Sequence, residues 1–435
     1  MNTPLEIQTS RRDFLKTSAL LGGALAAPAI LPGKLFAKEN SDTLRVGLIG
    51  CGGRGSGAAD QALSADSNVV LTAMGDAFED RLQTSLKNLQ TKHGEKVKVT
   101  PDKCFIGLDA FQKVIDSGVD VVLLTTPPGF RPQHLKAAVA AGKHIFTEKP
   151  MATDAPGVRS VIATAEEAKK KNLSLVAGFC YRYSHGVRGI MQQIHDGAIG
   201  DVKAIYTTYN TGSVWAPFAR KPEWTDMQYQ VKNWYYYTWL SGDHITEQAV
   251  HCLDKMSWIM HDVPPVKCIA HGGRQVRTGP EFGNIFDHFS VVYDYATGAR
   301  GFHFCRQQEH CFADNSDYIL GSDGVAQIVR AFSGPYIVKG KKSWRFKEDK
   351  PSDMYQNEHD EFFASIRSGK PINNGDYMAT STLIAIMGRM AAYTGQEITW
   401  EQALNSEERL TPENPTWETT VAVAPVAMPG QTKFI

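Results

Sequence analysis

The sequence lacks any excess of charge of one sign. Its 435 residues include 46 Lys and Arg against 46 Asp and Glu, so the formal net charge at pH 7 is +0. A balanced chain has no long-range field that would favour nucleic acid or an anionic membrane. The one tight basic run, Lys169–Lys171, fits the solvated end of a helix. We therefore expect no nucleic-acid partner.

Cysteine is scarce and never paired in a Cys-x-x-Cys motif. The 7 cysteines are scattered along the chain, which argues against a structural zinc site and against a dense disulfide framework. Because the number is odd, at least one thiol is unpaired in a monomer. Buried apolar thiols are the expected state, and we predict no metal site.

A long hydrophobic run is also missing. The most apolar stretch, residues 18–31, is shorter than the about 20 apolar residues that a membrane span needs. It follows Ser10-Arg11-Arg12-Asp13-Phe14-Leu15-Lys16, which resembles a twin-arginine export signal. We predict that residues 1–40 are this signal and a linker, cleaved near Ala29 or Ala37. The resemblance implies the twin-arginine machinery as a partner and a periplasmic or otherwise exported protein, translocated already folded.

Glycines mark the first structural motif of the remaining chain. The apolar run Val46–Ile49 is typical of a buried parallel strand, and the sequence Gly50-Cys51-Gly52-Gly53-Arg54-Gly55 follows it. In a G-x-G-x-x-G turn the first glycine permits a tight turn and the second lets the backbone approach a pyrophosphate. The third lets the next helix pack closely on the sheet. The pattern predicts a dinucleotide-binding turn.

A carboxylate lies at the distance from the glycine turn at which a dinucleotide-binding site binds the ribose. A second apolar run, residues 69–74, ends at Gly75-Asp76, and Asp76 lies 21 residues after Gly55. A carboxylate there accepts hydrogen bonds from ribose hydroxyls and repels a 2′-phosphate, so the cofactor is expected to be NAD rather than NADP. The alternative is a glycine-rich surface turn in which Asp76 caps a helix.

Alternation of strand and helix patterns continues to about residue 175 and then stops. The predicted fold is α/β, with a Rossmann dinucleotide-binding domain over residues 41–175. From Val202 the strand patterns follow one another without alternating helices, which favours a large, mainly antiparallel open sheet in a second α/β domain over residues 176–405. A long helix is expected over residues 243–261, and residues 406–435 form a tail.

Several motifs together resemble one enzyme family. They are the glycine turn, Thr126-Pro127, the run from Ala141 to Glu148-Lys149-Pro150, and His251-Cys252-Leu253-Asp254. On these the chain resembles the glucose–fructose oxidoreductase / inositol dehydrogenase / MocA (Gfo/Idh/MocA) family over roughly residues 43–400. The resemblance implies a two-domain enzyme that binds NAD or NADP and oxidises or reduces a hydroxyl of a sugar or cyclitol. It also implies a homo-oligomer, a dimer or tetramer.

Lys149 is the strongest catalytic candidate. A lysine at the carboxyl end of the strand pattern 144–147 can take a hydroxyl proton and polarise a carbonyl oxygen beside a nicotinamide. The alternative is a surface ion pair between Glu148 and Lys149. Glu247 and His251 stand four residues apart, so on a continuous helix they share one face, and we expect both to be catalytic. The family more often has Asp than Glu at this position.

Two alternatives remain for these residues. The segment is either an ordinary helix with a solvated Glu and a satisfied His, or a metal site formed by His244, Glu247 and His251.

The expected contacts fall into two sets. We expect the cofactor to contact Gly50, Gly52, Gly53, Arg54, Gly55, Asp76, Thr126, Pro127, His134, Glu148 and Lys149. We expect the substrate to contact Tyr181, Arg182, Asp243, His244, Trp215 and Arg220. The aromatic-rich segment 215–239 suits sugar stacking, but it can equally close a local core or a subunit interface.

The sequence as a whole predicts an exported NAD(H)-dependent oxidoreductase that acts on a hydroxyl or keto group of a sugar or glycoside and holds its cofactor tightly. One alternative on the same fold is a glycosidase that uses transient oxidation at C3 followed by elimination. Another is a non-catalytic sugar-binding relative.

Overall fold

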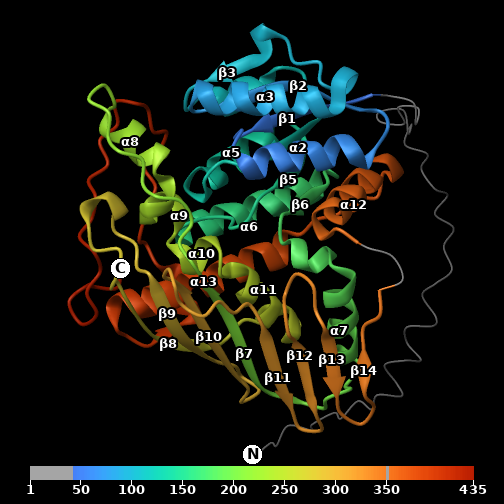
Figure 1. Ribbon diagram of the computed structural model, residues 1–435, viewed down its shortest axis with the longest axis vertical. Coiled ribbons are helices and arrows are strands. Elements are labelled where there is room, and N and C mark those ends of the chain that lie inside the picture. Colours follow the sequence, from blue (N-terminus) through green and yellow to red (C-terminus); the bar gives the residue numbers. More distant parts are fainter. Residues whose placement is uncertain (1–42, 349–351) are drawn as a thin grey trace, which may run out of the picture. The chain divides into compact units, whose positions relative to one another are not determined.

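A computed structural model describes residues 43–348 and 352–435 (Figure 1). The described residues from 43 onward form one compact unit. The predicted export signal therefore lies outside the described residues. Among the helices of the described part, none is long and apolar enough to cross a membrane.

The first part of this unit is a six-stranded parallel sheet with helices on both faces (Figure 1). Its order is β3-β2-β1-β4-β5-β6 and every neighbouring pair is parallel, which confirms the predicted Rossmann fold. The strands are β1 Leu44–Ile49, β2 Val69–Asp76, β3 Cys104–Ile106, β4 Val121–Leu124, β5 His144–Thr147 and β6 Leu175–Ala177. The helices are α2 Gly53–Ala65, α3 Glu79–His93, α4 Ala110–Asp116, α5 Arg131–Ala140 and α6 Ala155–Lys170.

The strand order reverses direction between β1 and β4, which lie side by side. In open α/β sheets this switch point leaves a crevice at the carboxyl ends of the strands, where ligands bind. The glycine turn follows β1 and Thr126-Pro127 follows β4, so both motifs lie at this crevice.

The second part is a nine-stranded sheet of order β14-β13-β12-β11-β7-β10-β9-β8-β15. Only β7 and β10 pair in parallel, so the sheet is mainly antiparallel, as predicted. Its strands are β7 Val202–Thr211, β8 Lys267–Gly273, β9 His288–Asp294, β10 Arg300–Gln307, β11 Asp317–Gly321, β12 Val325–Ile328, β13 Tyr336–Lys339, β14 Trp344–Arg345 and β15 Ile398–Thr399. Residues 43–435 form one compact unit, so the domain boundaries drawn from the sequence stay predictions.

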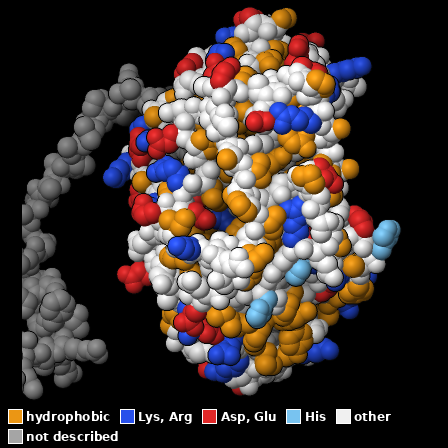
Figure 2. All heavy atoms as spheres, turned by 90° about the vertical axis from the view of Figure 1, so that its left-hand side faces the viewer, with side chains coloured by type: hydrophobic (Ala, Val, Ile, Leu, Met, Phe, Trp, Pro, Cys, Tyr) orange, Lys and Arg blue, Asp and Glu red, His pale blue; other side chains and the backbone are white. Residues whose placement is uncertain are grey.

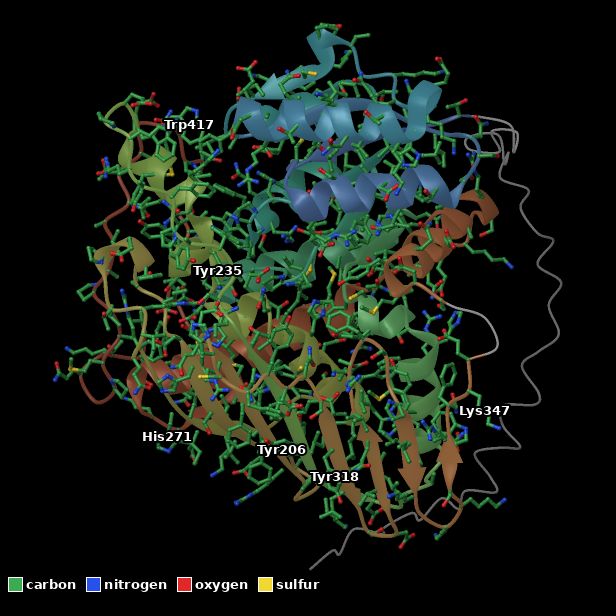
Figure 3. All side chains as sticks on the ribbon, in the orientation of Figure 1. Tyr206, Tyr235, His271, Tyr318, Lys347 and Trp417 are labelled. Carbon is green, nitrogen blue, oxygen red and sulfur yellow. The ribbon has the colours of Figure 1, made fainter. Side chains whose placement is uncertain are left out.

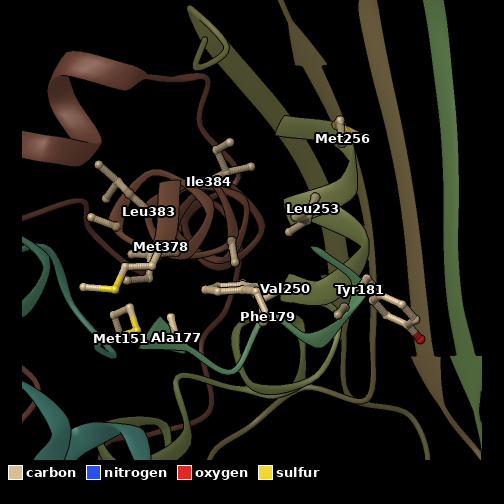
Figure 4. Close-up of a cluster of buried hydrophobic side chains, with 14 of the residues drawn as sticks. Met151, Ala177, Phe179, Tyr181, Val250, Leu253, Met256, Met378, Leu383 and Ile384 are labelled. Carbon is tan, nitrogen blue, oxygen red and sulfur yellow. The ribbon is translucent and has the colours of Figure 1, made fainter. Parts of the chain in front are cut away.

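The remaining helices are α7 His185–His195, α8 Asp226–Lys232, α9 Thr238–Ser241, α10 His244–Glu247, α11 Val250–Ile259, α12 Met354–Ser368, α13 Gly375–Thr394 and α14 Trp400–Asn405. Of these, α13 packs against α6 of the Rossmann part and β8 of the second sheet, and α11 packs against α13 and β7, so these two join the cores of the sheets. Figure 4 shows Leu253 of α11 and Ile384 of α13 in one apolar cluster with Met151 and Ala177 from the first part. This shared packing holds the edge of the Rossmann sheet against the second sheet.

The helix predicted over residues 243–261 is wrong in one respect, because the structure breaks it into α10 and α11. The amide of Ala249 bonds to the carbonyl of His244, five residues back, as does the amide of Gln248. Sharing one carbonyl shifts the hydrogen-bond register and ends α10 at Glu247. Glu247 and His251 therefore stand on two short helices.

One face of the nine-stranded sheet carries exposed apolar side chains. Tyr206 and Tyr318 are 42% and 40% exposed and lie opposite each other on β7 and β11. Leu320 and Ile269 are also exposed. Hydrophobic side chains gather over the lower part of the molecule in Figure 2, where Figure 1 has this sheet.

A buried ion cluster fixes α11 to the end of the Rossmann sheet. The guanidinium of Arg182 bonds to Asp254 at 2.8 Å and to Asp262 at 2.6 Å, and it lies 3.8 Å from the ring centroid of Tyr377. Ser381 also donates to Asp254. Burial raises the pKa of the Asp254 carboxyl, and the charge of Arg182 opposes that rise. The cluster depends on both charges being present.

We expect Asp254→Ala to lower the free energy of unfolding by about 3–5 kcal/mol, because it removes one charge of a buried pair. Urea unfolding followed by circular dichroism measures this. The control is Asp201→Ala, which removes the partner of Lys203 in an exposed pair and should change stability by less than about 0.5 kcal/mol. Equal effects for the two variants would contradict a structural role for the Arg182 cluster.

Candidate active site

A cavity of about 670 Å³ opens at the carboxyl ends of the Rossmann strands. Its walls come from the loops after β1, β2, β4 and β5 and from residues of the second part, including Tyr209, Glu247 and His251. No cluster of three or more potential metal ligands occurs among residues 43–348 and 352–435. The groups that the site offers for chemistry are single side chains and backbone groups.

The glycine turn leaves an open space above the start of α2. Gly50 has a φ of +95°, and a Cβ on Gly55 would lie 1.9 Å from the carbonyl oxygen of Gly50. A Cβ on Gly52 or Gly53 would meet no atom within 4 Å. Because α2 begins at Gly53 without a side-chain cap, its first N–H groups face this space. Such a cradle fits a pyrophosphate.

Asp76 closes one end of this cradle. One carboxylate oxygen accepts the amide of Cys51 at 2.6 Å and the other accepts the amide of Phe78 at 2.8 Å. Burial raises the pKa of Asp76, and these two hydrogen bonds oppose the rise. The carboxylate lines the cavity beside Arg81. The lone pairs that these bonds leave free on the carboxylate suit ribose hydroxyls. The alternative of a helix cap accounts for the bond from Phe78 but not for the place of Asp76 in the cavity wall.

A flat, apolar wall stands beside the cradle. The Thr126 hydroxyl and Nδ1 of His134 are 3.1 Å apart, and the His134 ring stacks on Phe111 with centroids 4.0 Å apart. Burial, followed by the nearby charge of Arg131, lowers the pKa of His134 to about 3. His134 is therefore a neutral ring at physiological pH. Pro127 continues the same wall.

Glu148 is held from the other side of the cavity. Nε of Arg54 lies 3.0 Å from a Glu148 carboxylate oxygen, and the Arg54 guanidinium stands over the ring of Tyr355 at 4.8 Å. A Cβ on Gly178 would come within 2.7 Å of the Glu148 carboxylate, so a larger residue there would displace this carboxylate.

The amine of Lys149 lies at the centre of the polar contacts. Its Nζ donates to the backbone carbonyl of Glu247 and lies 3.1 Å from the Glu247 carboxylate. The two side chains are 12% and 13% exposed, and both line the cavity. The pair therefore contradicts the alternative of a surface ion pair between Glu148 and Lys149.

Part of His251 lines the same cavity, and the rest of the side chain is buried. Burial, followed by the positive charges of Lys149 and Lys255, lowers the pKa of His251 well below its usual range. Its Nδ1 has no hydrogen-bond partner among the described residues. The ring of Tyr181 meets it edge-on with centroids 5.3 Å apart. His251 is thus a neutral imidazole beside Lys149.

The structure places most of the expected substrate contacts elsewhere. Tyr181 supports His251 from behind and is absent from the cavity wall, and Figure 4 shows its ring directed toward the strands. Arg182 is bound to Asp254 and Asp262. The Asp243 carboxylate accepts the amide of Phe286 and the hydroxyl of Tyr393. Burial and these partners keep all three side chains away from the cavity.

Two further candidates lie away from the cavity, whereas a third, Trp215, lines it. His244 is fully buried against Phe289, so the metal site of His244, Glu247 and His251 is not formed. Arg220 pairs with Asp226 at 2.6 Å on the surface. Trp215 lines the cavity, whereas Tyr235 and Trp239 belong to a local core. The aromatic segment therefore forms a local core and, through Trp215, part of the cavity wall, and its stacking on a sugar stays a prediction.

Sequence reasoning missed several residues of the cavity wall: Arg81, Phe111, Tyr209, Phe218, Lys232, Gln248 and Tyr355. Gln248 had a signal, since it directly follows Glu247. Tyr355 comes from α12, far along the chain, and nothing near it in the sequence marks it.

Comparison with known proteins agrees with this geometry. The model of the oxidoreductase family with an NAD-binding Rossmann fold (GFO_IDH_MocA) matches residues 44–176, and the GFO/IDH/MocA C-terminal domain matches residues 187–327. The chain is 25% identical to inositol 2-dehydrogenase of Rhizobium meliloti over 337 residues, which cover 76% of this chain and 91% of that one.

Two other similarities are more distant. The 2,7-anhydro-N-acetylneuraminate hydratase of Escherichia coli is 25% identical over 180 residues, 41% of this chain and 44% of that one. The aldose-aldose oxidoreductase of Caulobacter crescentus, solved with glycerol, superposes with a TM-score of 0.66 at 19% identity, covering 82% of this chain and 99% of that one. At that identity the superposition supports the fold alone. With two family models matched in chain order, this chain belongs to the Gfo/Idh/MocA family of oxidoreductases.

Proposed function

We propose that the protein is an NAD(H)-dependent oxidoreductase that acts on a hydroxyl or keto group of a sugar or polyol. The observation that carries this proposal is the amine of Lys149, which Glu247 holds in a cavity that also contains the open glycine cradle. The inositol 2-dehydrogenase relative supports a cyclic polyol or sugar as the substrate class.

The residues present fit a dinucleotide. Gly52, Gly53 and the start of α2 would hold the pyrophosphate, and Asp76 would bind the ribose hydroxyls. Bound NAD would supply the hydride acceptor for an alcohol carbon or, when reduced, the hydride donor for a ketone. NAD rather than NADP is favoured by the negative charge of Asp76.

Lys149 would move the proton. In the oxidation direction its neutral amine takes the proton of the substrate hydroxyl, and in the reduction direction its ammonium returns that proton to the carbonyl oxygen. Glu247 fixes the amine through its carbonyl and its carboxylate. His251 stays neutral because of its depressed pKa, so it can share a hydrogen bond with the same substrate oxygen without adding a positive charge.

Export and a tightly held cofactor belong to the proposal. They rest on the twin-arginine motif at residues 10–16 and on the scarcity of free NAD outside the cytoplasm. A retained cofactor would run a closed cycle, with one substrate oxidised and another reduced. A homo-oligomer would cover the apolar sheet face around Tyr206 and Tyr318, whose exposure supports it.

A second candidate is glycoside cleavage through transient oxidation and elimination. This second candidate is supported by the similarity to a hydratase that acts on an anhydro sugar derivative. Both candidates need Lys149 and a redox-active nicotinamide, but only the second releases an aglycone without a net change in NAD. A non-catalytic sugar-binding relative would need neither.

We expect the purified full chain, once denatured, to release a dinucleotide that is identified by mass spectrometry. We also expect the absorbance band of reduced nicotinamide in the native protein to change when myo-inositol, methyl glucosides or keto-sugars are added. Chromatography of the same mixtures detects any released aglycone. A protein that neither contains nor takes up a dinucleotide would sink the proposal.

We expect Lys149→Met to reduce kcat by about 10²–10⁴-fold, because it removes the proton-transfer group and retains a side chain of similar length. Cofactor content should persist, since the cradle is untouched. Steady-state kinetics and the absorbance of the isolated protein measure the two effects. Lys203→Met, which removes an exposed lysine of β7, is the control. Unchanged turnover in Lys149→Met would favour the non-catalytic alternative.

We expect Asp76→Asn to reduce the preference for NAD over NADP by roughly tenfold or more. The substitution removes the charge that repels a 2′-phosphate and leaves Arg81 to attract it. Dissociation constants of both dinucleotides, measured by fluorescence on cofactor-depleted protein, give the ratio. A ratio equal to that of the parent protein would show that Asp76 does not face the ribose.

A further inference from the structure

A buried hydrogen-bond chain leads from the second sheet to the cavity. It starts at Arg277, which is 2% exposed, and ends at Gln248 in the cavity wall. Nη2 of Arg277 donates to Oε1 of Gln307 at 2.7 Å. Nε2 of Gln307, which is fully buried at the end of β10, donates to the hydroxyl of Tyr235 and to Oε1 of Gln248, each at 2.7 Å. Figure 3 shows Tyr235 between the nine-stranded sheet and the Rossmann helices.

The chemistry of arginine fixes the direction of this chain. A guanidinium is a donor only, so the Gln307 atom that faces it must be the carbonyl oxygen. The Gln307 amide nitrogen must then point the other way, where both of its hydrogens are used. The Gln248 atom that faces Gln307 must in turn be an oxygen. An amide orientation that is ambiguous for an isolated glutamine is thereby determined.

The consequence appears at the cavity. With Oε1 of Gln248 engaged by Gln307, its Nε2 carries two hydrogens for which the described residues provide no acceptor. The indole Nε1 of Trp215 is a second such donor, since it is buried without a hydrogen-bond partner among the described residues and its ring lines the same cavity. Trp215 packs edge-on against Tyr235 with centroids 5.4 Å apart, so both donors lie beside the buried chain.

We propose that Gln248 is a specificity-determining residue whose amide donates a hydrogen bond to an acceptor oxygen of the sugar or polyol, with Trp215 as a second donor. Arg277 and Gln307 are positioning residues that act through Gln248. The proposal rests on the proposed function, because it takes the ligand of this cavity to be a polyhydroxylated ring. Such a site rejects an analogue without that oxygen, since the bound ring would cover the donor and leave it unpaired.

Gln248→Glu is the sharpest test. The new carboxylate still accepts the hydrogen bond from Gln307, so the buried chain keeps its contacts, but the atom that faces the cavity changes from donor to acceptor. Protein loaded with NAD is titrated by calorimetry with myo-inositol, methyl β-D-glucopyranoside and levoglucosan. For the tightest of these probes we expect affinity at pH 7.5 to fall roughly tenfold or more.

The pH dependence separates this role from a merely structural one. Protonation of the new carboxyl restores a donor, so the loss in Gln248→Glu should shrink at pH 5. The loss in Gln248→Met should not change with pH, because methionine has no proton to gain. Gln192→Met, which alters an exposed glutamine bonded to Asp196 on α7, should bind like the parent at both values.

Three further substitutions test the start of the chain at Arg277 and the second donor at Trp215. Arg277→Met frees the Gln307 amide to turn and should weaken probe binding, whereas Arg277→Lys retains a donor and should restore most of it. Trp215→Phe keeps the ring and removes only the N–H, so it should also weaken binding.

Three results would overturn the proposal: parent-like affinity in Gln248→Glu, a loss in that variant that does not depend on pH, or no binding of any probe by the parent. Failure of the proposed function looks different. In that case the parent binds a probe and shows the Gln248 effects, but the nicotinamide band does not change.

Discussion

The contact between Lys149 and Glu247 is the interaction on which the site depends. Lys149 directly follows β5 of the Rossmann sheet, and Glu247 ends α10 in the second part of the chain. Their bond therefore joins the groups that cradle a dinucleotide to those that face a substrate. Both side chains are largely buried, and the carbonyl and carboxylate of Glu247 fix the position of the amine. In the function proposed above, preorganisation of this kind would remove the cost of arranging the proton-transfer group.

The residues around this contact divide into those that face the cavity and those that hold them. Arg182, Asp243 and Tyr181 belong to the second group, and each has strong partners away from the cavity. Asp243 precedes α10 and Arg182 bonds to Asp254 of α11, so together they anchor the two short helices that carry Glu247 and His251. Their position close to the catalytic residues in the chain reflects support rather than contact with a ligand. Charged groups that are this deeply buried persist only where they are paired.

The break between α10 and α11 has a consequence of its own. A continuous helix would place Glu247 and His251 on one face and carry Gln248 about 100° away from Glu247. With the register shifted at Ala249, Glu247, Gln248 and His251 all line the cavity. Five consecutive residues thereby bring the carboxylate of Glu247, the amide of Gln248 and the imidazole of His251 to one wall.

The sequence by itself determined the Rossmann fold and placed the glycine cradle, Asp76 and Lys149 at the carboxyl edge of its sheet. These are local features, in which residue type, spacing and strand order suffice to place a group at the carboxyl edge of a parallel sheet. The chemical roles of Lys149, Glu247 and His251 belong to the proposed function. Only the tertiary structure decided which polar residues of the second part reach the cavity. Arg182 and Gln248 are both polar and close to catalytic motifs, but one is bound to distant carboxylates and the other is oriented by a distant arginine. Such partners come from segments far apart in the chain, so no pattern along the sequence contains them.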